Sequence, residues 1–210
     1  MISHDNGVIL VCVPYSGADI FENCYMQIQK TDCISSFDTK RLPNNKILTE
    51  NTLGNAIRKF HDYDLFSIVK SPYQRAYEMW VVGQSKLKKS RIGKQTIGEY
   101  YENLLNGWNC VEGDKIQTQV EYLKSDDNNS YFGASDVNFK VENLYHYEDL
   151  IKNKFDDINE FLSYNDMNDL SYYIDYDYDE TWRENYDKNS IDIVNYVFDE
   201  DFSYCGYGKI

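Results

Sequence analysis

The chain has 210 residues, enough for one domain with a sizeable core, and its hydrophobic content of 42% and aromatic content of 16% argue against a disordered chain. A formal net charge of −14 argues against proteins that bind nucleic acid or anionic membranes through a basic surface. We therefore expect a single domain over residues 1–210, with no nucleic-acid partner and no membrane partner.

The N-terminal segment predicts a strand, a tight turn and a helix. Residues 8–13, V-I-L-V-C-V, are typical of a strand that is buried on both faces. Pro14 and Gly17 interrupt the run, and apolar residues at helical spacing then predict a helix over residues 19–30.

Helices and strands are predicted to alternate along the rest of the chain. In chain order we expect a helix at 53–60, a strand at 65–69, a helix from Pro72 to about 82, a basic loop at 86–94, helices at 96–105 and 114–123, a polar loop at 126–130, a strand at 137–141, and helices at 146–154, 156–164 and 190–198. This alternation favours an α/β fold with a parallel sheet.

The turn after the first strand has the layout of an anion site. Backbone N–H groups at the start of a helix, together with the helix dipole, favour a bound anion. The Walker A pattern G-x-x-x-x-G-K-[ST] is absent, so we do not expect an enzyme that uses a nucleoside triphosphate. A plain connection between a strand and a helix is the alternative reading of this turn.

Residues 64–78, D-L-F-S-I-V-K-S-P-Y-Q-R-A-Y-E, carry the most specific motif. They resemble the second signature of the sulfotransferases, roughly F-x-[FIV]-V-R-N-P-Y-x-R-x-x-S. The turn at residues 13–20 then falls where that family has its phosphosulfate loop, roughly I-P-K-T-G-G-T-S. Residues 139–144 resemble the family's late strand and F-E-N-L turn, residues 117–123 a middle Q-x-x-Y-L segment, and residues 201–207 the D-F-x-x-F-G-Y ending of the carbohydrate-type branch.

This resemblance, over about residues 8–207, implies a fold and an activity. The fold would be α/β, with a P-loop-NTPase-like three-layer core in which helices flank a short parallel sheet. The activity would be transfer of a sulfo group from 3′-phosphoadenosine 5′-phosphosulfate (PAPS) to a hydroxyl acceptor, a carbohydrate in the branch resembled, without a metal. A base would take the acceptor's proton, and a cation would stabilise the leaving phosphate. Arg75 would be largely structural.

The resemblance also names the residues that would contact the donor. They are Tyr15, Ser16, Gly17, Ala18, Asp19 and Ile20 around the 5′-phosphosulfate, and Lys70 and Glu78 near the 3′-phosphate.

Several of these residues depart from the family pattern. Tyr15 stands in place of a Lys that contacts the bridging oxygen, Ala18 in place of a Gly, and Asp19 and Ile20 in place of a hydroxyl pair. At the second signature Lys70 replaces an Arg, which keeps the charge but loses the planar fork, and Glu78 replaces a Ser. Carboxylates at these positions would repel an anion by about 1 kcal/mol in water and by more in a half-buried site. The alternative function is therefore a catalytically degenerate protein that acts as a non-enzymatic binding module.

No motif identifies the catalytic base. The candidates are His4, His61, His146, Glu22 and Glu50. The basic residues at 86–94 could add positive charge near the donor, or could form a solvated loop. The acidic stretch at 175–180 lacks the spacing of an EF-hand, so we expect no metal. Trp80, Trp108 and Trp182 suit a sugar-binding cleft or, more simply, the core.

The sequence predicts a cytoplasmic protein or, as the alternative, an excised catalytic domain. The apolar run at residues 8–13 is too short for a signal-peptide core or a membrane span. The five cysteines are widely spaced and include no C-x-x-C pair, so we expect buried, reduced thiols.

Overall fold

A computed structural model of the chain shows an α/β protein whose ordered elements fall into two compact units. The residues described are 1–4, 6–29, 33–34, 51–87, 94–107, 116–125, 138–152, 154, 156–162 and 180–210. Met1–Val69 and Glu121–Tyr176 form the first unit, here named the sheet unit, and Lys70–Val120 and Asp177–Ile210 form the second, named the helical unit. The single domain expected from the sequence stays a prediction.

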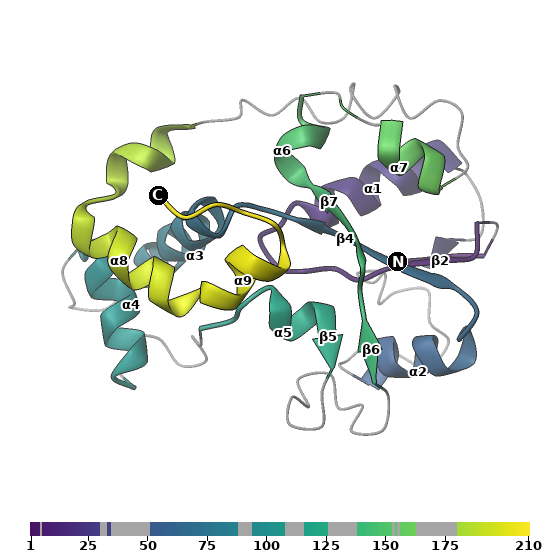
Figure 1. The fold of residues 1–210 in the computed structure, drawn as a ribbon, viewed down its shortest axis with the longest axis horizontal. Helices are drawn as coiled ribbons and strands as arrows, with labels where there is room; N and C mark the ends of the chain where they lie inside the picture. The colour runs from purple at the N-terminus through teal and green to yellow at the C-terminus, as the bar shows by residue number, and fades with distance from the viewer. Residues whose placement is uncertain are drawn as a thin grey trace. The chain divides into compact units, whose positions relative to one another are not determined.

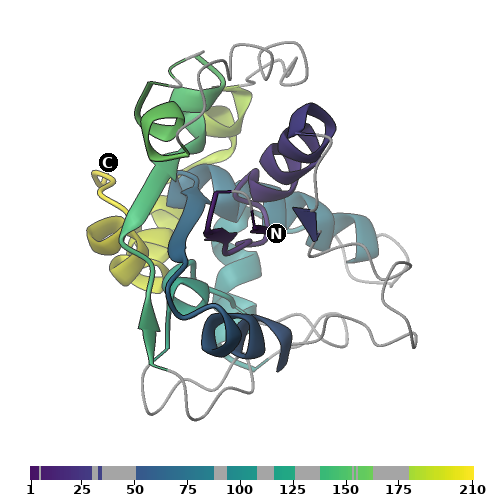
Figure 2. The ribbon, with the colours of Figure 1, turned by 90° about the vertical axis from the view of Figure 1, so that its right-hand side faces the viewer.

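A mixed sheet organises the sheet unit (Figure 1). Its strands, in spatial order, are β3 (Cys33–Ile34), β1 (Ile2–Ser3), β2 (Val8–Leu10), β4 (Asp64–Val69) and β7 (Asn143–His146). The last three run parallel, with Leu10 opposite Phe66 and Val69 opposite His146, and Figure 2 shows β7 in green alongside β4 in blue. The short β1 is antiparallel to both of its neighbours. The predicted α/β fold with helices flanking a sheet that contains parallel strands is thus confirmed.

Alternating side chains of the parallel strands build the core of this unit. Val8 and Leu10 of β2 share a face with Phe66 and Ile68 of β4, because side chains two residues apart point the same way. The helices α1 (Ala18–Gln29), α6 (Tyr147–Leu150) and α7 (Asp156–Phe161) pack their apolar residues on this face. Each large apolar side chain buried in this way contributes about 1.5–3 kcal/mol.

Some further elements of the chain are short. They are α2 (Asn51–Lys59), the one-turn helix α5 (Val120–Leu123), and the antiparallel pair β5 (Lys124–Ser125) and β6 (Phe139–Lys140).

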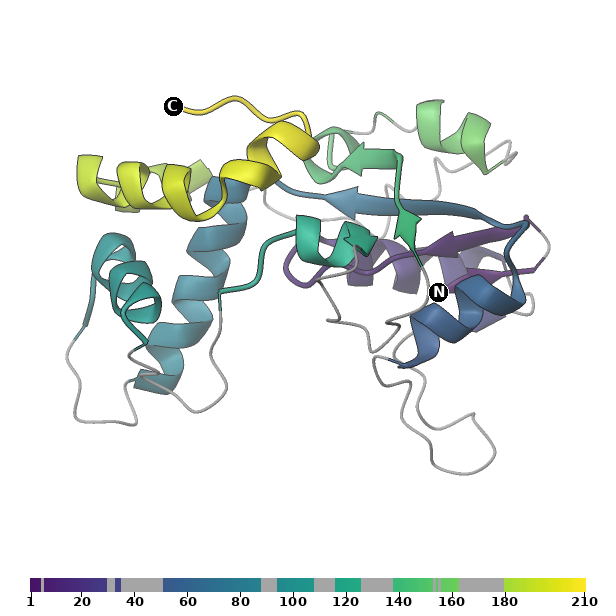
Figure 3. The ribbon, with the colours of Figure 1, turned by 60° about the horizontal axis from the view of Figure 1, so that its bottom comes forward.

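Aromatic side chains form the core of the helical unit. The elements are α3 (Pro72–Leu87), α4 (Ile97–Leu105), the 3₁₀ helix η2 (Glu180–Asn185), α8 (Lys188–Val197) and α9 (Asp199–Tyr204). Figure 3 shows α4 and α8 beside α3. The buried aromatic residues are Tyr73, Trp80, Tyr100, Tyr101, Trp182, Phe198 and Phe202. Trp80 and Trp182 thus serve the core, the simpler of the two roles considered for them.

Side chains cap two helices of this unit, α4 and α8. Thr96 accepts a hydrogen bond from the N–H of Glu99, and Glu99 accepts one from the N–H of Thr96, which together form a capping box at the start of α4. Asp187 caps α8 by accepting from the N–H of Ser190, and this bond holds the pKa of Asp187 below its usual value. Each cap contributes on the order of 1 kcal/mol.

Several predicted elements differ from the structure. Of the helix predicted at 146–154, only Tyr147–Leu150 (α6) is helical among the described residues, because His146 ends the strand β7 instead. Helix α3 passes through Gly83 to Leu87 instead of ending near residue 82. The Tyr100 ring packs so closely on Gly83 that a Cβ there would lie 2.6 Å from the Tyr100 hydroxyl oxygen, and this packing supports the helix through the glycine. Of the helix predicted at 114–123, the described residues 116–119 are not helical, and only Val120–Leu123 form the single turn of α5. Strand β7 was not predicted; its four residues are all half-buried, so the sequence lacks the contrast that marks a strand.

Candidate functional site

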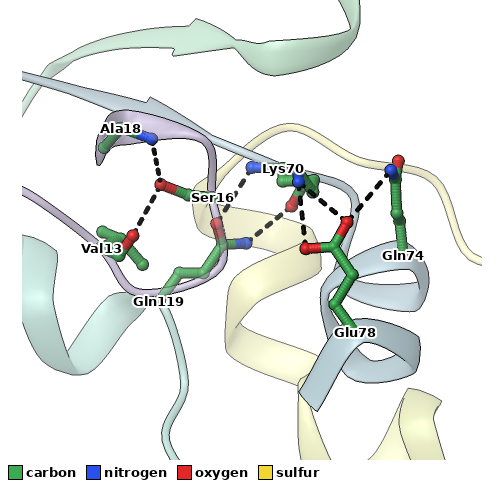
Figure 4. Close-up of polar contacts among 7 residues, drawn as sticks. All are labelled: Val13, Ser16, Ala18, Lys70, Gln74, Glu78 and Gln119. Atoms are coloured by element: carbon green, nitrogen blue, oxygen red, sulfur yellow. Dashed lines mark hydrogen bonds and ion pairs between the residues drawn. The ribbon is translucent and has the colours of Figure 1, made fainter. Parts of the chain in front are cut away.

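The conformation of the turn between β2 and α1 is fixed by hydrogen bonds of the Ser16 side chain and by two residues with positive φ. Tyr15 has φ 61° and Gly17 has φ 86°. The buried Ser16 hydroxyl donates to the carbonyl of Val13 at 2.8 Å and accepts from the N–H of Ala18 at 3.3 Å (Figure 4). These bonds hold the N-terminus of α1 at the carboxyl end of β2, where open α/β sheets bind ligands.

This turn has unused donors but an acidic neighbour. For the N–H groups of Gly17, Asp19 and Ile20 the structure records no hydrogen-bond partner within the part of the chain that it describes. Such groups at a helix N-terminus favour an anion. The Asp19 side chain is exposed in the first turn of α1, and its carboxylate opposes an incoming anion.

The ring of Tyr147 covers the turn at Gly17. A Cβ on Gly17 would lie 2.3 Å from Cδ2 of Tyr147, so only glycine permits this approach. Tyr147 is the first residue of α6, directly after β7, and it is buried. An anion at this turn would therefore bind beside an aromatic ring.

Tyr15 combines exposure with an unfavourable backbone. Its side chain is 37% exposed, and non-glycine residues at positive φ cluster at functional sites. It cannot supply the positive charge of the Lys that the sulfotransferase pattern has at this position, since a phenol is neutral at pH 7.

Replacing Tyr15 with Gly should raise the free energy of unfolding by roughly 0.5–1 kcal/mol. The left-handed conformation costs about 1–2 kcal/mol for an L-residue, and the extra backbone freedom of glycine in the unfolded chain offsets part of that gain. Urea unfolding followed by circular dichroism measures the change. Tyr15→Ala is the control, because it removes the ring and keeps the strain; equal stabilisation by both substitutions would contradict the role assigned to the backbone.

In the helical unit, Lys70 and Glu78 form an ion pair with each other. The Lys70 ammonium donates to both carboxylate oxygens of Glu78, at 2.9 Å and 3.1 Å, and Gln74 Nε2 donates to Glu78 Oε1 at 3.3 Å (Figure 4). The Lys70 side chain is 5% exposed and that of Glu78 is 32% exposed. The positive charge of Lys70, which we expected to act on a ligand, is thus neutralised by Glu78, the residue that replaces a Ser of the family pattern.

The backbone of Lys70 is held in place by Gln119. Gln119 Oε1 accepts from the Lys70 N–H at 3.1 Å, and Gln119 Nε2 donates to the Lys70 carbonyl at 2.9 Å. The amide of one side chain thus satisfies both polar groups of a buried backbone residue. Gln119 is itself fully buried.

Asp201 fixes the segment that carries Gln119. Its carboxylate accepts from the N–H groups of Gln119 and Val120 at 2.8 Å and 2.9 Å, and lies 3.9 Å from Nη1 of Arg75. Arg75 in turn donates to the carbonyl of Gln117 at 2.6 Å. These bonds engage the Gln117 carbonyl and the N–H groups of Gln119 and Val120 outside helical pairing, which is why the described residues 116–119 do not extend α5 toward its N-terminus.

Burial raises the pKa of Asp201, while the Arg75 guanidinium and the two N–H donors oppose that rise. Arg75 and Asp201 are both fully buried. Arg75 contacts protein groups in this network, as expected of a structural residue.

The histidines lie at different ends of the sheet. His4 is bonded to the hydroxyl of Tyr63 at 3.0 Å, and the exposed His61 lies in the turn that leads into the amino end of β4. His146 ends β7 at its carboxyl end, with Nδ1 4.0 Å from a carboxylate oxygen of Asp149, which also pairs with Lys154 at 2.9 Å. The carboxyl end is where ligands bind in such sheets, so His146 is the best-placed candidate base of the three.

Glu22 is enclosed in the core of the sheet unit. Its side chain is fully buried, 3.7 Å from the amine of Met1, and it accepts a hydrogen bond from the Cys12 thiol at 3.4 Å. This position favours a structural role over a base. Cys12 and Cys205 are free thiols, and burial raises the pKa of Cys205, in line with the reduced cysteines expected.

The structure brings the predicted donor residues together as two groups. Those numbered 15–20 form part of the turn and the first residues of α1 in the sheet unit, and Lys70 and Glu78 form the pair in the helical unit. Three partners were not predicted as site residues: Tyr147, Gln119 and Asp201. The last two lie inside motif segments, which was a usable signal, whereas Tyr147 has none.

Some predictions fall outside the described residues. They concern Glu50, Trp108, most of the basic run 86–94, the polar loop 126–130 and residues 175–179 of the acidic stretch. Among the residues that are described, no group of three or more His, Cys, Asp or Glu side chains is placed to hold a metal ion. No helix in the described ranges has the length and apolar character to cross a membrane.

No family model, curated protein or solved structure matches the chain. The resemblance to sulfotransferases therefore rests on the motifs quoted above.

Proposed function

We propose that this protein transfers a sulfo group from PAPS to a hydroxyl acceptor of the carbohydrate class. In this proposal the sheet unit is the P-loop-like part of a three-layer core. The turn at residues 14–17 would receive the 5′-phosphosulfate, and the region of Lys70 the 3′-phosphate.

One observation supports the proposal above the others: residues from three separate motif segments bond to one another. Arg75 of the P-Y-x-R motif lies beside Asp201 of the D-F ending, and Asp201 accepts from the backbone of Gln119, in the Q-x-x-Y-L segment. Gln119 then holds the backbone of Lys70. Chance matches spread over the chain would have no reason to meet in one network, so their meeting favours a common origin for the motifs.

The chemistry is an in-line displacement at sulfur. The acceptor oxygen forms a bond to sulfur as the bond from sulfur to the bridging oxygen breaks, and that oxygen leaves with the electron pair on 3′-phosphoadenosine 5′-phosphate (PAP). The acceptor's proton passes to a base, for which His146 is the best-placed described histidine. The N–H groups at the start of α1 would stabilise charge on the leaving phosphate.

A non-catalytic binding module on the same fold is the second candidate. The Lys70–Glu78 pair favours it, because the ammonium already has a carboxylate partner and Tyr15 adds no charge at the turn. Such a protein would keep the network around Asp201 and would not turn over PAPS.

Calorimetry with PAP tests the donor site. Under the proposal, PAP binds and adenosine 5′-phosphate, which lacks the 3′-phosphate, binds at least about tenfold more weakly, a difference of about 1.4 kcal/mol. Absence of PAP binding at millimolar concentration would contradict the enzymatic proposal. Binding of PAP without turnover of PAPS would favour the binding module.

Restoring the family residues provides a second test. The double substitution Tyr15→Lys with Glu78→Ser adds a cation at one predicted phosphate position and removes an anion at the other. PAP affinity should rise at least about tenfold, since each like-charge contact weakens anion binding by one to several kcal/mol. A weaker complex would show that the motif alignment is wrong.

A further inference from the structure

The Glu78 carboxylate is bound as an oxyanion ligand would be bound. Among the described residues, the Lys70 ammonium donates one hydrogen bond to each of its oxygens, and the Gln74 amide donates a third bond. A cation and an amide donor converging on adjacent oxygens suit a tetrahedral phosphate or sulfate group equally well. Glu78 reaches them from the second turn of α3, four residues after Gln74.

The two partners differ in how firmly they are held. Lys70 is 5% exposed at its side chain, and Gln119 clamps its backbone on both polar groups. Glu78 has 32% of its side chain exposed and several rotatable bonds. The ammonium is therefore the enclosed member of the pair, and the carboxylate, being the more exposed, is the member that a ligand can replace.

An unsatisfied acceptor on Gln74 is a second indication of a ligand beside Lys70. Its side chain is buried, with 7% exposed, and its Oε1 has no hydrogen-bond partner among the described residues. An acceptor left without a donor in a buried place costs about 1–3 kcal/mol. A hydroxyl group next to the oxyanion of a ligand would supply the missing donor.

We propose that Glu78 occupies an oxyanion subsite from within the protein, and that a phosphate or sulfate monoester with a neighbouring hydroxyl displaces it to reach Lys70. Naming this ligand as the 3′-phosphate of the sulfo donor rests on the proposed function; the subsite itself does not. The ligand and the Glu78 carboxylate then compete for Lys70, so only an anion that binds Lys70 more strongly than Glu78 does occupies the subsite.

Titration with inorganic phosphate, monitored by calorimetry, tests the subsite on the full chain. Glu78→Gln keeps the size of the side chain and removes its charge, and it should tighten phosphate binding at least about tenfold. Adding Lys70→Met to this variant should abolish the gain. Equal affinity in the wild type and in Glu78→Gln, or a gain that survives Lys70→Met, would overturn the proposal.

Glu142→Gln is the matched control, because Glu142 is an exposed carboxylate that pairs with Lys140 at 2.8 Å and its loss changes the net charge equally. A similar gain in this control would reveal a general charge effect and overturn the subsite. Thermal unfolding checks that each variant is folded. If Glu78→Gln does not fold, Glu78→Asp keeps the charge and withdraws it by one methylene, and it should also tighten binding; unchanged affinity there counts against the proposal.

The same variants titrated with PAP separate the subsite from the proposed function. Tighter phosphate binding by Glu78→Gln without PAP binding would support the subsite and contradict the sulfo donor. PAP binding with no effect of Glu78→Gln on the affinity for phosphate or for PAP would support the sulfo donor and contradict the subsite.

Discussion

Replacing Asp201 with Asn should lower the free energy of unfolding by about 3–5 kcal/mol, the range found when one partner of a buried ion pair is removed. The amide keeps the volume of the carboxylate but turns an NH₂ donor toward one of the two N–H groups that Asp201 accepts, those of Gln119 and Val120. It also removes the charge 3.9 Å from the buried Arg75. Trp80 and Trp182 lie in the core of the helical unit, so urea unfolding followed by tryptophan fluorescence reports on the affected region.

Asp199→Asn is the control for this substitution. Asp199 also pairs with a cation, Lys209, but its side chain is 70% exposed. Exposed pairs contribute about 0–1 kcal/mol, so the control should remain close to the wild type. Similar losses of unfolding free energy in both variants would mean that the Asp201 network stabilises the helical unit no more than an exposed ion pair does.

The network has a functional consequence as well as a structural one. Asp201 orders the segment that presents Gln119, and Gln119 holds the backbone of Lys70. Gln119→Ala removes both of these hydrogen bonds to the Lys70 backbone, so its destabilisation should come with weaker anion binding at Lys70, although Gln119 does not contact the ammonium group itself.

Replacing Gly17 with Ala should be strongly destabilising, by about 3 kcal/mol or more. A positive φ of 86° costs an L-residue about 1–2 kcal/mol. The new Cβ would also meet the Tyr147 ring at 2.3 Å, and forcing extra volume into a packed site costs typically 1–3 kcal/mol. Thermal and urea unfolding followed by far-ultraviolet circular dichroism measure the loss.

Gly107→Ala separates the two contributions. Gly107 has a similar positive φ of 73°, and a Cβ there would meet no described atom within 4 Å. It should show the backbone cost alone, about 1–2 kcal/mol. Adding Tyr147→Leu to Gly17→Ala should recover part of the steric loss; if Gly17→Ala costs no more than Gly107→Ala, the Tyr147 ring does not cover the turn.

The sequence alone determined the elements whose signal is local. The run at residues 8–13 predicts β2 because β-branched and apolar residues in succession suit a strand buried on both faces, and all of Val8–Leu10 is buried. The helices α1, α4 and α8 correspond to the helices predicted at 19–30, 96–105 and 190–198, and the first of these follows from apolar residues at helical spacing. These features depend on neighbours within a few residues, so local sequence patterns are sufficient to predict them.

The tertiary structure decided what depends on residues far apart in the chain. No local pattern joins Asp201 to Gln119, which are 82 positions apart, or brings the Tyr147 ring onto Gly17. The sequence placed Lys70 and Glu78 in one motif and predicted that their charges would act separately on a ligand. In the structure they act on each other, because α3 carries Glu78 back over its first turn to a lysine whose backbone is already fixed from elsewhere.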